Sequence, residues 1–343
     1  MKVRKLLCLL MALSLVFCLL GCSRFFEKES KATEPLVDAT PETSATTEPT
    51  QETEPPKTES TITPLLYKVT DDKGNIVWLF GSIHVGYDEY YPLPDYVYDA
   101  FDSADAIAFE IDMRAFEKDM NAQIEALSQL VYLDGTTIKD HIDPELYTKA
   151  VGILEKYGYY NKVYDSYCPA MWETLFSQIL VEETELDPNL GIDYHLLDKA
   201  YEEGKEILEV ESAMFQYGMM AKFSPELQEL LLKGSVEYFD DLDTAKDELY
   251  EMVELWCSGD EQAFADYLAA EDDEIEDPAE LALYEEYNTA MIVDRNLNMT
   301  DFAEDALASG KEVFICVGAA HIVGDGAMAQ LLAQRGYTVT LVK

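Results

Sequence analysis

Short apolar runs separated by turn residues predict a β-hairpin at the start of the globular region. Residues 65–70 and 76–80 are β-prone, and the Asp-Asp-Lys-Gly-Asn sequence at 71–75 between them is rich in turn formers. Two such runs are typical of antiparallel strands joined by a short loop. A third apolar run, at 106–111, predicts a buried strand, because almost every position in it is apolar.

Apolar residues in the middle of the chain recur at helical spacing. One apolar face spans 146–157 and another spans 249–256, and both are typical of amphipathic helices. At the C-terminus the pattern returns to strand, helix and strand, at 313–317, 328–332 and 337–342, as parallel strands joined by a helix usually produce. The sequence therefore predicts an α/β fold, a mixed central sheet with an N-terminal hairpin, a C-terminal βαβ unit and a large helical insertion lobe.

The N-terminus has the pattern of an export signal. A basic segment at 1–5 precedes an apolar run at 6–20 that is too short for a spanning helix of ~20 apolar residues. The Leu-Leu-Gly-Cys sequence at 19–22 resembles the lipobox of bacterial lipoproteins. This resemblance implies a signal peptide at 1–22, lipid on the thiol of Cys22 and a location on the extracytoplasmic face of the cell membrane. An ordinary signal peptide with an incidental cysteine is the alternative.

Residues 23–63 are dominated by Thr, Glu and Pro, and no aromatic residue occurs between Phe26 and Tyr67. Such a segment buries too little apolar area to offset its ordering entropy, and its prolines and like charges favour an extended chain. We expect a disordered tether here, followed by one folded domain at 64–343.

The composition indicates that the chain can form a core and which class of partner it is not expected to bind. The chain has 343 residues, of which 48% are hydrophobic and 11% aromatic, so it can form a sizeable core. Its 68 acidic and 24 basic side chains give a formal net charge of −44. Because a phosphate backbone is bound through Lys and Arg, we expect no nucleic-acid partner. Most of the carboxylates are expected on solvated helix faces.

Two of the four histidines follow apolar strands in the same way. His84 and His321 each come just after a predicted strand, and each has a glycine three residues earlier, Gly81 and Gly318. Ligands gather at the carboxyl ends of strands in α/β sheets, and glycine there permits a tight turn or a close approach. One such histidine is usually structural, but two placed alike predict a shared site.

Glu110 lies in the centre of the third predicted strand. An unpaired buried carboxylate is costly, so we expect it to be paired, protonated or bound to a cation. Asp112 points the same way by strand alternation but is a weaker candidate, because it lies at the strand end. The alternative is an edge strand with Glu110 in water.

Three further polar residues are candidates. Glu211 follows another short β-like run. Asp193 opens a helix, where the helix dipole alone would favour its charge. Arg295 lies in a helical stretch rich in acids and could simply pair with Asp294 or Glu286 at the surface.

Together these motifs resemble the TraB/GumN family, which includes the TIKI-type membrane-tethered proteases. The resemblance runs from about Leu65 to the end of the chain. It implies an α/β fold with a helical lobe and, in the TIKI branch, a metal-dependent peptidase. The corresponding motifs are the paired Gly-x-x-His elements at 81–84 and 318–321, the acidic strand position Glu110, Gly-Ile-Asp at 191–193, Val-Glu-Ser…Gln at 210–216 (with Val and Ser where the family has Leu and Thr) and Asp-Arg-Asn at 294–296.

Imidazole and carboxylate ligands suit Zn²⁺, Mn²⁺, Co²⁺ or Fe²⁺. The resemblance favours Mn²⁺ or Co²⁺, with Zn²⁺ as a further candidate. We expect His84, Glu110 and His321 to bind one ion and to leave a position open for water. Glu211 would be the general base or a further ligand, and Arg295 would stabilise the developing oxyanion. The expected supporting residues are Gly81, Gly318 and Asp193.

The expected function is a surface-anchored metal-dependent hydrolase, a peptidase acting on peptides or protein N-terminal segments. One alternative is a non-catalytic surface lipoprotein that binds a peptide or signal, as the resemblance to the pheromone-shutdown branch would imply. Another is a Cys316 nucleophile paired with His321, although a cysteine in such an apolar run is more often a small buried hydrophobe. His141 and His195 are not expected in the site.

Overall fold

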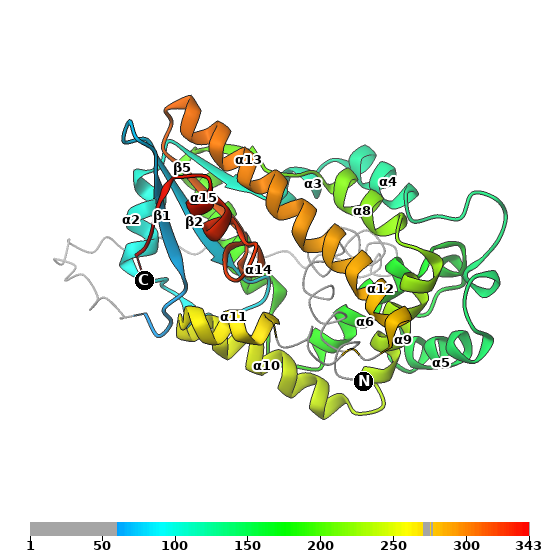
Figure 1. Cartoon of the computed structure of the whole chain (residues 1–343). Coiled ribbons are helices and arrows are strands. Elements are labelled where there is room, and N and C mark those ends of the chain that lie inside the picture. Colours follow the sequence, from blue (N-terminus) through cyan, green and yellow to red (C-terminus); the bar gives the residue numbers. More distant parts are fainter. Residues whose placement is uncertain (1–59, 270–274, 276, 343) are drawn as a thin grey trace, which may run out of the picture.

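A six-stranded mixed sheet lies at one end of the protein (Figure 1). The computed structural model describes residues 60–269, 275 and 277–342. The strands are β1 (Leu66–Thr70), β2 (Ile76–Ser82), β3 (Ala106–Phe109), β4 (Glu206–Glu209), β5 (Val313–Gly318) and β6 (Thr338–Leu341). They are arranged in the order β4-β3-β5-β2-β1-β6, in which β4, β3, β5 and β2 are parallel.

The predicted hairpin is confirmed. β1 and β2 are antiparallel, with Leu66 opposite Phe80 and Thr70 opposite Ile76. The turn between them is stabilised by Asp71, whose Oδ1 accepts hydrogen bonds from the backbone N–H groups of Lys73 at 2.9 Å and Asn75 at 2.8 Å. Asp commonly forms such local bonds in turns, so this short segment determines its own conformation.

The C-terminal strands also form as predicted, but they are not neighbours. β5 lies between β3 and β2, and its residues 313–317 are at 1% exposure or less. The chain then passes through two helices to β6, which pairs antiparallel with β1 at the edge of the sheet. β5 and β6 therefore run in the same direction with β2 and β1 between them.

Helices cover the sheet and form a large lobe beside it, which confirms the predicted fold class. In Figure 1, α13 and α15 cross in front of the sheet, while α5, α6, α9 and α12 belong to the lobe. The α-helices are α2 (Asp95–Ser103), α3 (Met113–Phe116), α4 (Met120–Ser128), α5 (Pro144–Lys156), α6 (Pro169–Glu182), α7 (Ile192–Glu203), α8 (Ala213–Ala221), α9 (Pro225–Tyr238), α10 (Leu242–Ser258), α11 (Glu261–Ala269), α12 (Pro278–Asn288), α13 (Asp294–Ser309), α14 (Ala319–Ile322) and α15 (Met328–Gln334). A π-helical segment, η6 (Thr289–Val293), joins α12 to α13, and short 3-10 helices are η1 (Asp88–Tyr90), η2 (Ile138–Asp140), η3 (Lys162–Ser166) and η4 (Pro188–Leu190).

Contacts with the body of the fold begin three residues before the predicted start of the domain, where the Thr61 hydroxyl donates to the Glu89 carbonyl at 3.0 Å. Ile62 is buried, and the Thr63 N–H donates to the Cys257 carbonyl at 2.9 Å. The predicted signal peptide, its Cys22 and residues 23–59 of the predicted tether lie outside the described residues, so these remain predictions. In the part of the chain that the structure describes, none of the helices has both the length and the apolar character needed to cross a membrane.

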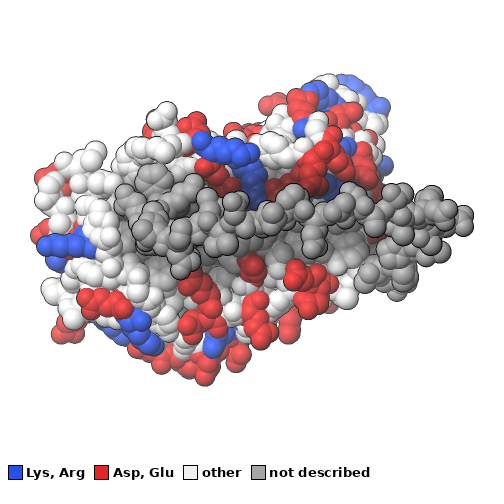
Figure 2. Space-filling model, turned by 180° about the vertical axis from the view of Figure 1, so that it is seen from behind, with Lys and Arg blue, Asp and Glu red and all other residues white. Residues whose placement is uncertain are grey.

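Acidic side chains are spread widely over the surface, as Figure 2 shows for one face. Several of them begin helices, where their carboxylates accept hydrogen bonds from free backbone N–H groups. Such caps also place negative charge at the positive end of the helix dipole. Part of the acidic excess therefore has a local structural role, and the capping residues include Asp112, Asp119, Asp143, Asp241 and Asp277.

The helical lobe contains one buried carboxyl group that does not belong to the candidate site. Glu173 lies in α6, which packs against α9 and α10, and only 2% of the residue is exposed. Among the residues that the structure describes, neither of its carboxylate oxygens has a hydrogen-bond partner. Burial raises the pKa of Glu173 well above its ordinary value. The group is therefore expected to be protonated in the folded state at neutral pH.

Replacing Glu173 with Gln is expected to increase the free energy of unfolding at pH 8 and to leave it nearly unchanged near pH 4.5, the ordinary pKa of the group. The folded wild type keeps a proton that the unfolded chain loses above that pH. Its stability should thus fall by about 1.4 kcal/mol per pH unit until the folded-state pKa is reached. Urea unfolding of both proteins from pH 4.5 to 8 measures this difference. Glu155→Gln, at an exposed position of α5, is the control and is measured in the same way. If the free energy of unfolding changes equally with pH in the wild type and in both variants, the prediction is contradicted.

Candidate active site

Four neighbouring parallel strands bring the predicted site residues to one edge of the sheet. His84 comes two residues after the end of β2, Glu110 directly follows β3 and Glu211 comes two residues after β4. His321 lies in α14, the short helix that begins directly after β5. Because the carboxyl ends of parallel strands share one edge, side chains from four separate parts of the chain meet there.

The two motif glycines allow this close approach. A Cβ atom on Gly81 would lie 3.0 Å from the Ala319 Cα, so the absence of a side chain lets β2 pack directly against α14. Gly318 lies beside the carboxylate of Glu110, and its N–H donates to Glu110 Oε1 at 2.9 Å. A Cβ there would be 3.4 Å from that same oxygen. Each glycine thus serves backbone packing at the site.

His84 is held by a carboxylate. Its Nδ1 is 2.7 Å from Asp193 Oδ2, and Asp193 Oδ1 also accepts a hydrogen bond from the Ser82 hydroxyl at 2.6 Å. Burial alone would lower the pKa of His84, but the charge and hydrogen bond of Asp193 outweigh it, and the pKa is raised. Asp193 is buried in the first turn of α7, which places its carboxylate near the positive end of the helix dipole.

His321 is held by an amide. Its Nδ1 is 2.7 Å from Asn296 Oδ1, and Asn296 Nδ2 donates to the Gly326 carbonyl at 3.0 Å. Because that carbonyl can only accept, the amide oxygen must face the ring, and Nδ1 of His321 must carry the proton. Burial, and then the nearby charge of Arg295, lower the pKa of His321 to about 3. The ring is therefore neutral, with the lone pair on Nε2.

Arg295 joins the two carboxylates. Its Nη2 donates to Glu110 Oε2 at 2.6 Å and to Glu211 Oε2 at 2.8 Å, while its Nε donates to Glu211 Oε1 at 2.9 Å. Gln216 Nε2 donates to both carboxylates, at 3.0 Å to Glu110 and 2.9 Å to Glu211. Burial alone would raise the pKa of Glu110, but Arg295 and the two histidines lower it to about 2. Glu110 is therefore ionised.

The surroundings of the carboxylate differ from two sequence-based predictions. β3 ends at Phe109, so Glu110 follows the strand instead of lying in its centre, and the edge-strand alternative is wrong because β3 lies between β4 and β5. Asp112 does not reach the site. It caps α3 by accepting from the Ala115 N–H at 2.9 Å, and it also accepts from the Tyr201 hydroxyl. The strand is too short for its alternation to extend to this residue.

The alternative interpretation of Arg295, a pair at the surface, is also wrong. Its side chain is only 3% exposed and faces Glu110 and Glu211. Glu286, one of the expected surface partners, instead accepts hydrogen bonds from the backbone N–H and hydroxyl of Ser224. The charged cluster is therefore internal, and its groups come from the segments that directly follow β3 and β4, from α8 and from α13.

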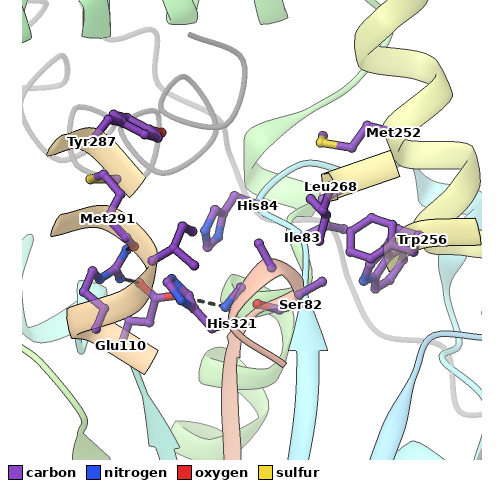
Figure 3. Close-up of a pocket in the computed structure, with 16 residues that line it drawn as sticks. Ser82, Ile83, His84, Glu110, Met252, Trp256, Leu268, Tyr287, Met291 and His321 are labelled. Atoms are coloured by element: carbon purple, nitrogen blue, oxygen red, sulfur yellow. Dashed lines mark hydrogen bonds and ion pairs between the residues drawn. The ribbon is translucent and has the colours of Figure 1, made fainter. Parts of the chain in front are cut away.

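A cavity of about 80 Å³ opens beside these groups (Figure 3). Its polar wall contains His84, Glu110, Arg295 and His321. In Figure 3, Trp256, Leu268 and Met252 lie on one side of the histidines, and Tyr287 and Met291 lie on the other. A smaller cavity shares His84 and Glu110 and is also lined by Asp193 and Gln216. Glu211 is not among the described residues that line either cavity.

The donor atoms around the larger cavity suit a divalent ion in their chemistry. Partners on Nδ1 orient both imidazoles, an arrangement typical of metal-binding histidines, and Glu110 supplies an ionised oxygen. The position that a Cβ on Gly318 would take is 3.4 Å from Glu110 Oε1 and 4.0 Å from His84 Nε2. Across the described residues, no group of three or more His, Cys, Asp or Glu side chains forms a ready metal site. The imidazole nitrogens and the carboxylate are therefore suitable ligands in type, but they would need to move closer together to bind one ion.

Cys316 has the surroundings of a packing residue. It is fully buried in β5, and its Sγ lies 3.9 Å from Asp193 Oδ1. Burial raises the pKa of this thiol well above its ordinary value, which disfavours the nucleophilic thiolate. His141 and His195 lie elsewhere, the first stacked on Tyr132 and the second beside the Tyr98 hydroxyl.

Three residues of this network were given no role in the site from the sequence. Ser82, Asn296 and Gln216 bond to Asp193, His321 and the paired carboxylates, respectively. Each lies within or directly beside a motif that the sequence does show, since Ser82 is inside the first Gly-x-x-His element and Asn296 follows Arg295. Their position in or beside these motifs was the only signal in the sequence that they belong to the site. The residues to which they bond are distant in sequence, so the sequence does not show these bonds.

Comparison with known proteins agrees with the resemblance seen in the motifs. A profile of the TraB/PrgY/gumN family matches residues 65–341. The uncharacterized protein YbaP of Escherichia coli strain K12 is 24% identical over 256 residues, which cover 74% of this chain and 86% of YbaP. YbaP of Shigella flexneri matches to the same extent, and no solved structure gives a significant match. Because the family profile spans nearly the whole described region, the chain belongs to the TraB/PrgY/gumN family.

Proposed function

We propose that this protein is a metal-dependent hydrolase that acts on peptides or protein N-terminal segments. The observation that carries the proposal is the meeting of His84, His321 and Glu110 at one cavity, with both imidazoles oriented through Nδ1. Oriented imidazoles beside an ionised carboxylate are the usual components of a catalytic metal centre. The peptide substrate is proposed from the TIKI branch of the family that the motifs resemble.

In this proposal the three residues His84, His321 and Glu110 hold the ion. A divalent ion bound there would act as a Lewis acid toward a carbonyl group and would make water more nucleophilic at neutral pH. Arg295 lines the cavity and carries a permanent positive charge, so it stabilises negative charge that develops on the substrate. Mn²⁺ or Co²⁺ remains the favoured ion, with Zn²⁺ as a further candidate.

The remaining polar residues orient these groups. Asp193 and Asn296 hold the two imidazole rings. Gln216 donates to the carboxylate of Glu110, and Glu211 accepts from the guanidinium of Arg295. Glu211 was expected to act as the general base or as a further metal ligand. Since it bonds to Arg295 and Gln216 and does not line the described cavities, we assign it a positioning role.

Titration of the full-length chain in detergent with Mn²⁺, Co²⁺ and Zn²⁺ tests this proposal. Isothermal calorimetry should show binding at micromolar metal. His84→Ala and His321→Ala should each weaken it by more than about 100-fold, because they remove ligands and not just their supports. His195→Ala is the matched control, since this histidine bonds to Tyr98 in another groove. Absence of binding, or equal binding by all three variants, would refute the metal site.

A non-catalytic peptide-binding protein is the second candidate. It is favoured by the finding that no ready cluster of three metal-binding side chains occurs within the described ranges. Peptide binding without turnover, in the presence of each of the three metals, would select this candidate over the hydrolase.

A further inference from the structure

The cavity beside the two histidines has a second wall that the proposed chemistry does not use. This apolar wall consists of Met252 and Trp256 from α10, Phe264 and Leu268 from α11, and Tyr287 and Met291 from α12 and η6. No charged side chain is included in it. It faces the same space as His84 and His321 (Figure 3).

Part of the wall is held rigidly. The Trp256 indole N–H donates to the Gly81 carbonyl at 2.9 Å, which connects the wall directly to the first Gly-x-x-His motif. Met252 and Met291, in contrast, have unbranched thioether side chains that adapt their shape to a ligand. A fixed aromatic side with flexible methionines beside it is well suited to enclose one apolar group of limited size.

The π-helical segment aligns the wall with the charged cluster. Tyr287, Met291 and Arg295 are spaced four residues apart along α12, η6 and α13. In a regular α-helix, positions four and eight apart are rotated by about 40° and 80° around the axis. The wider turn of η6, at Thr289–Val293, offsets this rotation, so all three side chains line one cavity. Such π-helical insertions occur frequently at functional sites.

We propose that the apolar wall is a side-chain pocket that selects a branched aliphatic residue, such as leucine, next to the reacting bond of a peptide. This proposal rests on the proposed function, because it names the substrate of the same site. The whole cavity, polar wall included, has a volume of about 80 Å³, which is about half that of the roughly 150 Å³ apolar cavity that accepts benzene, so we expect its apolar side to take a branched aliphatic group in preference to an indole ring. Discrimination between leucine and alanine of at least about 10-fold is expected, because a single methylene in an apolar pocket already contributes about 10-fold to 200-fold and the two side chains differ by three carbon atoms.

Blocked pentapeptides of the form acetyl-Ala-Ala-Xaa-Ala-Ala-amide test the pocket, with leucine, alanine, aspartate or tryptophan at Xaa. The full-length chain in detergent is titrated with each peptide in the presence of Mn²⁺. Binding is followed by calorimetry and cleavage by mass spectrometry. The leucine peptide should bind at least about 10-fold more tightly than the others.

Two variants change the pocket in opposite directions. Leu268→Trp fills it and should remove the preference for leucine, whereas Met291→Ala enlarges it and should raise the affinity of the tryptophan peptide relative to the leucine peptide. Leu281→Ala, at an exposed apolar position of α12, is the control and should bind like the wild type. If circular dichroism shows that Leu268→Trp does not fold, the peptide affinities of Met291→Ala alone test the pocket.

The two readouts separate this inference from the proposed function. A leucine preference in binding with no cleavage would support the pocket and refute the hydrolase. Equal affinity for all four peptides, or an unchanged preference in Met291→Ala, would overturn the pocket even if the peptides are cleaved.

Discussion

Replacing Arg295 with methionine is expected to lower the free energy of unfolding by about 3–5 kcal/mol. The guanidinium of Arg295 donates to Glu110 at 2.6 Å and to Glu211 at 2.8 Å, in a region where its side chain is 3% exposed. Methionine keeps much of the length but leaves two nearby buried carboxylates with no cation. Urea denaturation followed by circular dichroism at pH 7 measures the loss.

Arg335→Met is the matched control, because Arg335 pairs with Asp301 and Glu304 near the surface. A partly exposed pair of this kind contributes about 0–1 kcal/mol. The double variant Glu211→Gln/Arg295→Met should recover part of the loss, since it removes one of the unpaired charges. If Arg295→Met unfolds no more easily than Arg335→Met, the buried cluster does not stabilise the fold as we infer.

Asp193→Asn is expected to lower the rate of the proposed peptide hydrolysis by about 10²–10⁴-fold with little change in secondary structure. The carboxylate accepts from both Ser82 and the Nδ1 of His84. An amide can instead present its NH₂ group to Nδ1, which would move the imidazole proton to Nε2 and remove the lone pair from the cavity. Steady-state kinetics on a cleaved peptide, with Mn²⁺ present, measures the effect.

Metal affinity gives a second readout of the same change, and it should fall by about 10–100-fold. Asp198→Asn is the control, since Asp198 lies on the same helix but pairs with Arg114 outside the site. If the Asp193 and Asp198 variants retain equal metal affinity and equal rates, orientation of His84 by Asp193 has no role in function.

The elements that could be predicted from the sequence are those whose cause is local. The hairpin was correctly predicted because Asp71 closes its own turn onto Lys73 and Asn75. The apolar faces of α5 and α10 were visible because helical periodicity reports burial directly. The end of β3 was misplaced. The apolar run continues to Ile111 although the strand stops at Phe109, so hydrophobicity did not mark the point at which the backbone leaves the sheet.

Some residues of the candidate site were easier to predict than others, again because only local patterns are visible in the sequence. His84 and His321 were identified because each repeats the same motif after a strand, a pattern contained within four residues. Arg295 was placed in the site only through the resemblance of Asp-Arg-Asn at 294–296 to the family, and its acidic neighbours in sequence left a surface pair as the alternative. Its actual partners, Glu110 and Glu211, come from two other strand ends.

The sequence by itself determined the family, the α/β class and the two glycine–histidine motifs, because these depend on residue types and spacings within short segments. Only the tertiary structure decided that Asp193 and Asn296 orient the imidazoles, that Arg295 is buried between two carboxylates, and that an apolar wall faces them. The physical reason is that burial and pairing depend on which strands and helices become neighbours. No single stretch of chain contains that information.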